Sequence, residues 1–117
     1  MGDFRKLKVW QRAKDLAVFT YKLTTYGEFA SDYGLRDQIR RAAVSIPSNI
    51  AEGDESGTDK QSIRYFYTSR GSSAEVLTQA IIANEIGYLQ NQDFLHIENE
   101  CQSISKMLNR LIKARSN

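Results

Sequence analysis

The chain has 117 residues, 41% of them hydrophobic and 26% charged, which is typical of one globular domain covering residues 1–117. Its net charge of +2 is too small to indicate a nucleic-acid-binding protein by itself, and no apolar run reaches the roughly 18 residues of a membrane span. The first residues lack the apolar stretch of a signal peptide, and Cys101 is the single cysteine. We therefore expect a cytoplasmic protein that has no internal disulfide and no contact with a membrane.

Apolar residues recur at intervals of three and four along the first part of the chain, which predicts a helix over residues 6–25. The same spacing predicts a second helix that Ser31 or Asp32 can cap and that continues to about Glu52, with Gly53 supplying the positive φ of a helix stop. Pro47 lies inside this second helix, although a proline there lacks the required N–H and costs about 3 kcal/mol. Two interpretations are open: a kink that shapes packing within the chain, or a bent surface for a second subunit.

A third helix is predicted from its capping residue Thr58 to about Ile86, where Gly87 ends it. The residues at its centre, 69–73, are all small or polar, which fits either a weakly hydrated outer face or the close approach of another helix. Asn91 is expected to cap a fourth helix, which carries an unbroken seam of apolar residues. Three short connections then predict an all-α, antiparallel up-down-up-down four-helix bundle with a proline-containing second helix.

Basic residues gather near both ends of the chain, and acidic residues gather near its middle turn. Residues 1–14 carry five basic residues and one acidic residue (net +4), residues 106–117 also carry +4, and residues 52–59 carry −4. In the predicted bundle these segments meet at one pole, where either the acidic turn offsets the basic ends or a basic pole binds phosphates. The residues predicted to bind RNA or DNA there are Arg5, Lys6, Lys8, Arg12, Lys106, Arg110 and Lys113.

The inventory of catalytic groups is thin. His96 is the only histidine, and Cys101 occupies a seam position where a buried, unreactive side chain is expected. The acidic turn around Asp54 lacks the spacing of an EF-hand, and a solvated turn is the preferred interpretation. We therefore predict no catalytic residue, no metal site and no cofactor.

Aromatic residues are more numerous than a small core can take up, so we expect some of them at contacts between subunits. Of the three adjacent aromatics at positions 65–67, Tyr65 is expected to leave the core. The residues predicted at such an interface are Trp10, Arg40, Pro47, Asn49, Tyr65, Tyr67, Arg70 and Glu75. A scaffold that binds another protein, without contact to nucleic acid, is the alternative function.

Several segments of the sequence resemble one family. They are the Val9-Trp10-Gln11 segment, the stretch YGLRDQIRRAAVSIPSNIAEG over residues 33–53, the stretch RYFYTSRGSSAE over residues 64–75, and Gly87-Tyr88-Leu89. On these residues the chain resembles the 23S rRNA-intervening-sequence family, also called the four-helix-bundle protein family.

Members of that family are short bacterial four-helix bundles whose molecular activity is not established. A related accessory protein of diversity-generating retroelements is a ring-like pentamer that contacts a reverse transcriptase and nucleic acid. The resemblance therefore implies a homo-oligomer, with a pentamer as the candidate assembly, and a basic surface. It implies no catalytic residues.

Overall fold

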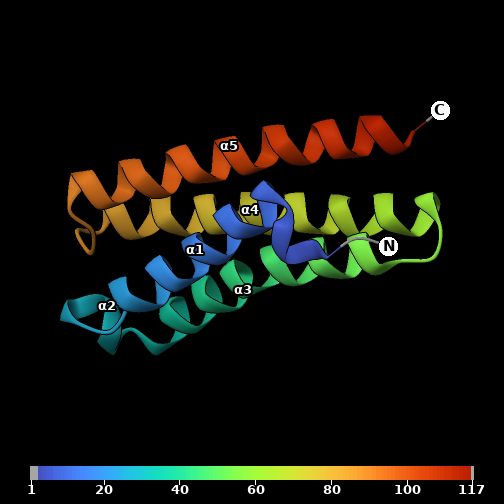
Figure 1. Cartoon of the computed structure of the whole chain (residues 1–117). Helices are drawn as coiled ribbons and strands as arrows, with labels where there is room; N and C mark the ends of the chain where they lie inside the picture. The colour runs from blue at the N-terminus through green and yellow to red at the C-terminus, as the bar shows by residue number, and fades with distance from the viewer. Residues whose placement is uncertain (1–2, 117) are drawn as a thin grey trace.

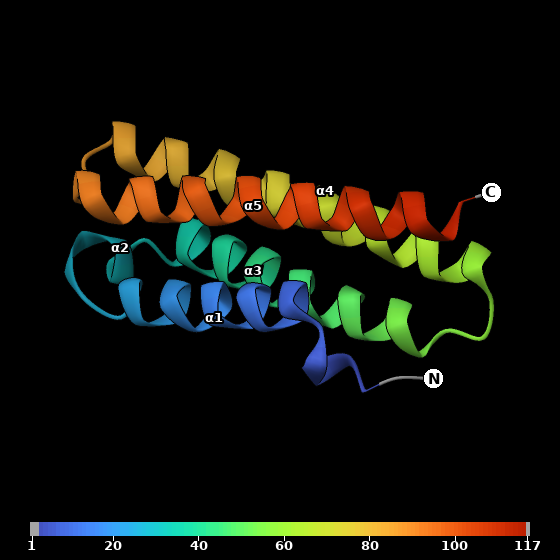
Figure 2. The same ribbon diagram turned by 45° about the horizontal axis from the view of Figure 1, so that its top comes forward.

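The computed structural model describes residues 3–116, and this part of the chain is helical without any β-strand. Its elements are η1 (Phe4–Lys6), α1 (Lys8–Leu23), α2 (Gly27–Ser31), α3 (Tyr33–Glu55), α4 (Asp59–Glu85) and α5 (Asn91–Arg115). The four long helices run antiparallel, as Figures 1 and 2 show from two angles. Helix α3 packs against α1 and α4, and so does α5. Helices α1 and α4 therefore lie diagonally opposite each other in the bundle. The predicted four-helix bundle is confirmed.

Side-chain caps begin two of the long helices where the sequence predicts them. The Leu35 backbone N–H donates to Asp32 Oδ1 at 3.1 Å, and the Gln61 backbone N–H donates to Thr58 Oγ1 at 3.2 Å. These bonds satisfy amide groups that have no partner inside the helix. The predicted cap at Asn91 is wrong, because Asn91 is already the first helical residue of α5 and Gln90 precedes it without a side-chain bond.

The first connection contains a helix that the sequence analysis missed. Helix α1 ends at Leu23 instead of continuing to residue 25, and Gly27, with a φ of 70°, begins the short helix α2. Phe29 of this short helix is 1% exposed, and its ring centroid lies 5.5 Å from that of Tyr88. Helix α2 therefore closes the apolar core at the end of the bundle farthest from the α3–α4 turn (Figure 1).

The predicted role of Gly53 as a positive-φ helix stop is wrong. Among the described residues only Gly27 and Gly87 have positive φ, and Gly53 lies inside α3, which continues to Glu55. A Cβ atom built on Gly53 would lie 2.5 Å from Cε1 of Phe66, whose side chain is fully buried. Gly53 is therefore needed for the close approach of α4 to α3.

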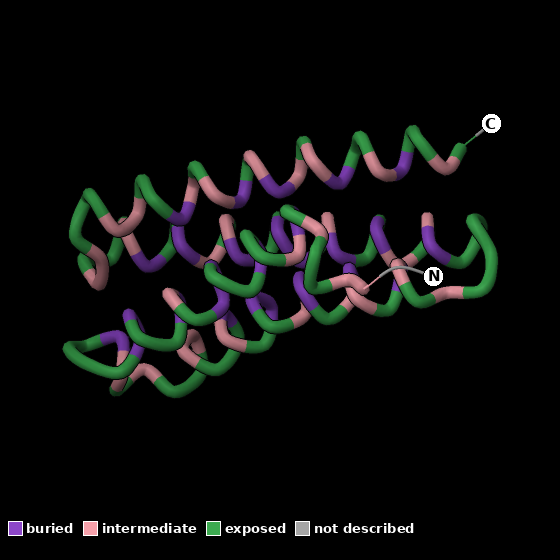
Figure 3. Tube along the Cα trace, viewed as in Figure 1, coloured by how far each residue is buried: buried purple, intermediate pink, exposed green. Residues whose placement is uncertain are grey.

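The small polar centre of α4 faces α3 and α5, so the interpretation as a weakly hydrated outer face is wrong. Ser69, Ser72 and Ser73 are all buried, and Figure 3 shows the buried positions along the inner sides of the long helices. Ser69 Oγ donates to the Ile46 carbonyl oxygen at 2.8 Å, and Ser72 Oγ donates to Ser45 Oγ at 2.9 Å. Short hydroxyl side chains thus let the two backbones approach closely while keeping their own polar groups satisfied.

Candidate nucleic-acid interface

The register between α1 and α5 follows from one ion pair. Arg12 Nε of α1 lies 2.8 Å from Glu100 Oε1 of α5. Both helices rise about 1.5 Å per residue and run in opposite directions, so Lys8, one turn before Arg12 on the same side of α1, lies about level with Ile104. The basic start of α1 is therefore beside the basic half of α5, and Figure 1 shows η1, the end of α5 and the α3–α4 turn in the same half of the bundle.

A second contact sets the register between α4 and α5. Arg70 Nη1 donates to Asn109 Oδ1 at 2.8 Å, which places residues 64–74 of α4 beside residues 105–115 of α5. Neither residues 60–74 nor residues 101–115 contain an aspartate or a glutamate. The exposed side of α5 is therefore flanked on its α4 side by a second stretch of helix that lacks negative charge.

We call the resulting surface the basic band. It crosses the exposed side of α5 and extends to the neighbouring elements on both sides. Its members are Lys6 of η1, Lys8 of α1, Arg70 of α4, and Lys106, Arg110 and Lys113 of α5. The band runs along the side of the bundle instead of forming the predicted cap at its pole, because α1 begins only at the level of residue 104.

The seven residues predicted to bind nucleic acid fall into two groups. Arg5 and Arg12 are paired within the chain: Arg5 Nη2 lies 3.1 Å from Asp3 Oδ2, and Arg12 is bound to Glu100. These hydrogen bonds raise the pKa of both guanidinium groups above the ordinary value and lower the pKa of Asp3. The other five are exposed and have no carboxylate oxygen within 4.0 Å among residues 3–116; they are Lys6, Lys8, Lys106, Arg110 and Lys113.

The acidic turn between α3 and α4 neutralises the charge of Arg115, which is not one of the seven residues predicted to bind nucleic acid. Asp54 Oδ1 lies 3.5 Å from Arg115 Nη2, and the guanidinium of Arg115 also lies 5.2 Å from the ring centroid of Phe66. The other acidic residues around this turn, Glu52, Glu55 and Asp59, are exposed to solvent. The turn therefore neutralises the last basic residue of α5 and leaves Lys106, Arg110 and Lys113 unpaired within the described chain.

Three of the residues predicted at a subunit interface make contacts within this chain. Arg40 Nε donates to Thr24 Oγ1 at 2.7 Å, and Arg40 Nη2 donates to the carbonyl oxygens of Thr24 and Tyr21, each at 3.3 Å. This guanidinium caps the C-terminus of α1, where a cation is favourable. Pro47 is buried inside α3, and Asn49 Nδ2 donates to the Ser45 carbonyl oxygen at 2.8 Å.

The other predicted interface residues lie wholly or partly on the surface. Trp10 is half-buried, and its ring packs edge-on against Phe4 with 5.2 Å between centroids. Tyr67 leaves the core with 48% of its surface exposed, whereas Tyr65, the residue expected to do so, is half-buried. Glu75 is exposed and lies with Gln38 and Arg41 along the groove between α3 and α4, while Arg70 is half-buried; the interface itself stays a prediction.

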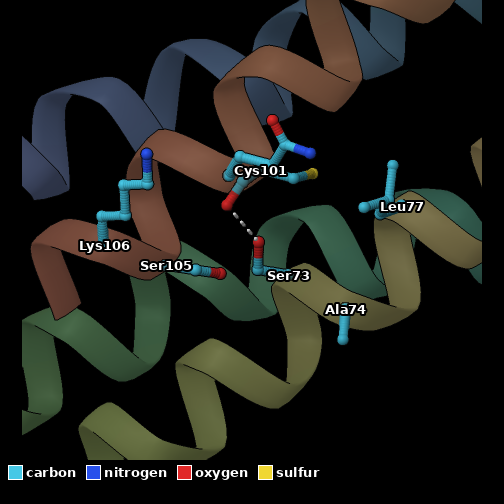
Figure 4. Close-up of a pocket in the computed structure, with 7 residues that line it drawn as sticks. Ser73, Ala74, Leu77, Cys101, Ser105 and Lys106 are labelled. Carbon is cyan, nitrogen blue, oxygen red and sulfur yellow. Dashed lines mark hydrogen bonds between the residues drawn. The ribbon is translucent and has the colours of Figure 1, made fainter. Parts of the chain in front are cut away.

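The described residues offer little for covalent or metal chemistry. Cys101 lines a shallow pocket between α4 and α5, where Ser73 Oγ donates to its backbone carbonyl oxygen at 3.2 Å (Figure 4). Burial raises the pKa of the Cys101 thiol to about 11, so the thiol is neutral near pH 7. His96 packs edge-on against Phe19, and no group of three or more metal-ligating side chains occurs within residues 3–116.

Together these features define a four-helix bundle that carries a set of exposed cations without a carboxylate partner around one helix, among the described residues. The chain belongs to the 23S rRNA-intervening sequence protein family, whose model matches residues 5–110. Its fold is similar to a crystal structure of a protein of unknown function from the S23 ribosomal protein family of Bacteroides thetaiotaomicron. The TM-score is 0.82, with 21% identity over 90% of this chain and 98% of that one, a likeness that shows the fold alone.

Neither of these comparisons assigns an enzymatic activity. No curated protein matches the chain. None of the helices within residues 3–116 is both long enough and apolar enough to cross a membrane.

Proposed function

We propose that this chain is a non-catalytic helical bundle that binds nucleic acid, as structured RNA or DNA, through the basic band. The observation that carries this proposal is the set of five exposed lysines and arginines that have no carboxylate partner within the described residues. A cation that is unpaired in the free protein can exchange its counterions for a phosphate without first breaking an ion pair.

The geometry favours a local site over a general effect of charge. The whole chain carries only +2, so its average field is weak. Lys106, Arg110 and Lys113 recur at intervals of four and three, which places them on one side of α5. Lys8 of α1 and Arg70 of α4 flank this side, so a polyanion lying over α5 meets cations from three helices.

The proposal is tested with a triple variant that combines Lys106→Gln, Arg110→Gln and Lys113→Gln. Binding to an RNA hairpin and to a DNA hairpin is followed by fluorescence anisotropy over a range of salt concentrations. We expect the affinity of the triple variant for both hairpins to be at least about tenfold lower than that of the wild type. The slope of log affinity against log salt should lose between two and three units, because each lost phosphate contact removes about one.

The matched control removes the same charge from the opposite side of the bundle. Lys14→Gln, Lys22→Gln and Arg41→Gln alter exposed residues of α1 and α3 and also change the net charge by three units. Because Lys14 and Lys22 border the groove between α1 and α3, light scattering must show that this variant keeps the mass of the wild type. This variant should bind within about twofold of the wild type, since its cations are outside the basic band. Equal losses in the two variants, or no binding by the wild type even at low salt, would show that the proposal is wrong.

Self-association is the second part of the proposal, and a different surface supports it. The groove between α1 and α3 is lined by Val18, Tyr21 and Val44, which are 45%, 44% and 41% exposed, with Ala17 and Pro47 beside them. Apolar side chains gathered on one exposed surface are typical of contacts with another protein. A second copy of this chain is the proposed occupant.

Light scattering should therefore give a mass above the 13.3 kDa of one chain, and Val18→Glu combined with Val44→Glu should return it to that value. A wild-type mass of 13.3 kDa would contradict self-association. The same groove would then favour the alternative function, a scaffold that binds another protein. Binding of that partner should survive nuclease treatment, and the α5 triple variant should not weaken it.

A further inference from the structure

One exposed aromatic side chain lies at the edge of the basic band. Tyr67 of α4 is 48% exposed, and the guanidinium carbon of Arg70 lies 4.7 Å from the centroid of its ring. Arg70 in turn donates to Asn109 Oδ1 of α5 at 2.8 Å. The guanidinium is thus held between the aromatic ring and the neighbouring helix, and it orients the ring from one side.

The surroundings of Tyr67 are cationic. Arg64 is exposed three residues before Tyr67, and Arg70 lies three residues after it, so the ring is flanked by a guanidinium on each side along the surface of α4. The register set by Arg70 and Asn109 places Tyr67 about level with Ile112, between Arg110 and Lys113 on α5. No aspartate or glutamate occurs in either of these stretches of helix.

Two other exposed tyrosines of the described residues, Tyr33 and Tyr21, stack with an arginine, and both lack this environment. Tyr33 at the start of α3 is 67% exposed, and Arg36 lies 4.7 Å from its ring centroid. Arg36 Nε, however, is 3.0 Å from Asp37 Oδ1. Asp32 directly precedes Tyr33, so a polyanion there would meet carboxylates. Tyr21 is 44% exposed with Arg40 4.6 Å from its ring centroid, and Asp37 lines the same pocket. Of the three exposed tyrosines that stack on an arginine within the described residues, only Tyr67 lies among cations in stretches of helix without an aspartate or glutamate.

The chemistry of this arrangement fits an unpaired nucleotide. When one face of an aromatic ring stacks on an arginine, the other face stays available for a base, and every base offers a flat π surface. In a duplex these surfaces are covered by neighbouring base pairs, so the contact needs a single strand, a loop or a bulge. The exposed Arg64 on α4, and the exposed Arg110 and Lys113 on α5, offer cations for the phosphates of the same strand.

We propose that Tyr67 stacks on an unpaired base and that the basic band thereby prefers single-stranded or looped nucleic acid over duplex. This inference rests on the proposed nucleic-acid binding and adds the class of ligand to it. It assigns Tyr67 and Arg70 to contact with a nucleotide instead of a subunit interface.

The test compares Tyr67→Leu, Tyr67→Phe and the matched control Tyr33→Leu. The probes are a single-stranded deoxythymidine oligomer of about 12 nucleotides, a length within the range that single-strand binders cover, and a blunt duplex of the same length. Tyr67→Leu should weaken binding of the single strand by roughly 5- to 150-fold, the usual effect of losing one stacked base, and should leave duplex binding within about twofold. Tyr67→Phe and Tyr33→Leu should bind the single strand like the wild type.

Two readouts separate this inference from the proposed function and from a structural effect. If the wild type binds neither these probes nor the RNA and DNA hairpins, both proposals fall; if it binds the hairpins but not the single strand, only the stacking assignment is overturned. If the wild type binds but Tyr67→Leu loses nothing, or loses single strand and duplex equally, only the stacking assignment is overturned. Light scattering and thermal denaturation of each variant complete the test, because a loss of binding together with a lower mass would assign Tyr67 to a subunit contact.

Discussion

Substituting Gly53 by alanine adds a methyl group that has two opposing effects on stability. Alanine is favoured over glycine inside a helix by about 1 kcal/mol, and Gly53 is helical. The new Cβ would, however, lie 2.5 Å from Cε1 and 2.9 Å from Cδ1 of Phe66, where carbon atoms normally keep about 3.5–4.0 Å. The ring or the helix must therefore move by about 1 Å.

That movement is costly because the ring of Phe66 is enclosed by other groups of the chain. Its side chain is fully buried, and the guanidinium of Arg115 lies 5.2 Å from its ring centroid. Forcing an extra methyl group into such packing costs about 1–3 kcal/mol. After the gain in helix propensity is subtracted, we expect Gly53→Ala to lower the free energy of unfolding by about 1 kcal/mol, which corresponds to about 4 °C in Tm for a chain of this size.

Gly71→Ala is the matched control, because Gly71 is an exposed glycine in the middle of α4. A Cβ built there meets nothing within 4 Å, so only the helix propensity changes. This variant should be stabilised by about 1 kcal/mol, which makes the expected difference between the two substitutions about 2 kcal/mol.

Urea denaturation followed by far-UV circular dichroism measures both variants against the wild type. Adding Phe66→Leu to Gly53→Ala should recover part of the loss, since the double variant removes the clashing ring edge, and a double-mutant cycle would isolate that coupling. If Gly53→Ala proved as stable as Gly71→Ala, the close approach of α4 to α3 at this position would be wrong.

Three further outcomes are expected. Arg40→Ala should lower the free energy of unfolding by about 1–3 kcal/mol, because it removes the charged cap of α1; a loss below about 0.5 kcal/mol in denaturation would contradict that role. Cys101, whose pKa burial raises to about 11, should react with a thiol reagent only after denaturant is added; labelling of the native chain at the rate of a free cysteine would contradict its burial. The hydrogen bond from Tyr88 to Asp32 raises the pKa of the phenol above its usual 10.0, so ultraviolet titration should show one late tyrosine that Asp32→Asn returns to its ordinary range. The stability from this bond is fully present below about pH 10 and lost as pH rises through the folded-state pKa, so the free energy of unfolding should fall there in the wild type and much less in Asp32→Asn.

The helices themselves follow from short-range patterns in the sequence. The three- and four-residue spacing of apolar side chains predicts each long helix, and Asp32 and Thr58 begin two of them through contacts three residues along the chain. These features depend only on neighbours within one turn, so they can be recognised without a tertiary structure. The same local logic misplaced Gly53, because a glycine near a predicted helix end is typical both of a positive-φ stop and of close packing.

The candidate site depended on contacts between residues far apart in the sequence. Sequence counting found the basic segments at the two chain ends, but it did not include Arg70 of α4 in the basic surface. The hydrogen bond from Arg70 to Asn109 joins residues 39 positions apart, and only the register it sets brings Tyr67 beside the cations of α5.

The sequence alone therefore determined that this chain forms four amphipathic helices joined by short connections, and that positive charge gathers near both of its ends. Only the tertiary structure decided which cations are paired, which stay free and where they meet. The physical reason is that the helical repeat fixes which side of a helix a residue occupies. The axial register between two helices, in contrast, is set by side-chain contacts between them, such as that of Arg12 with Glu100.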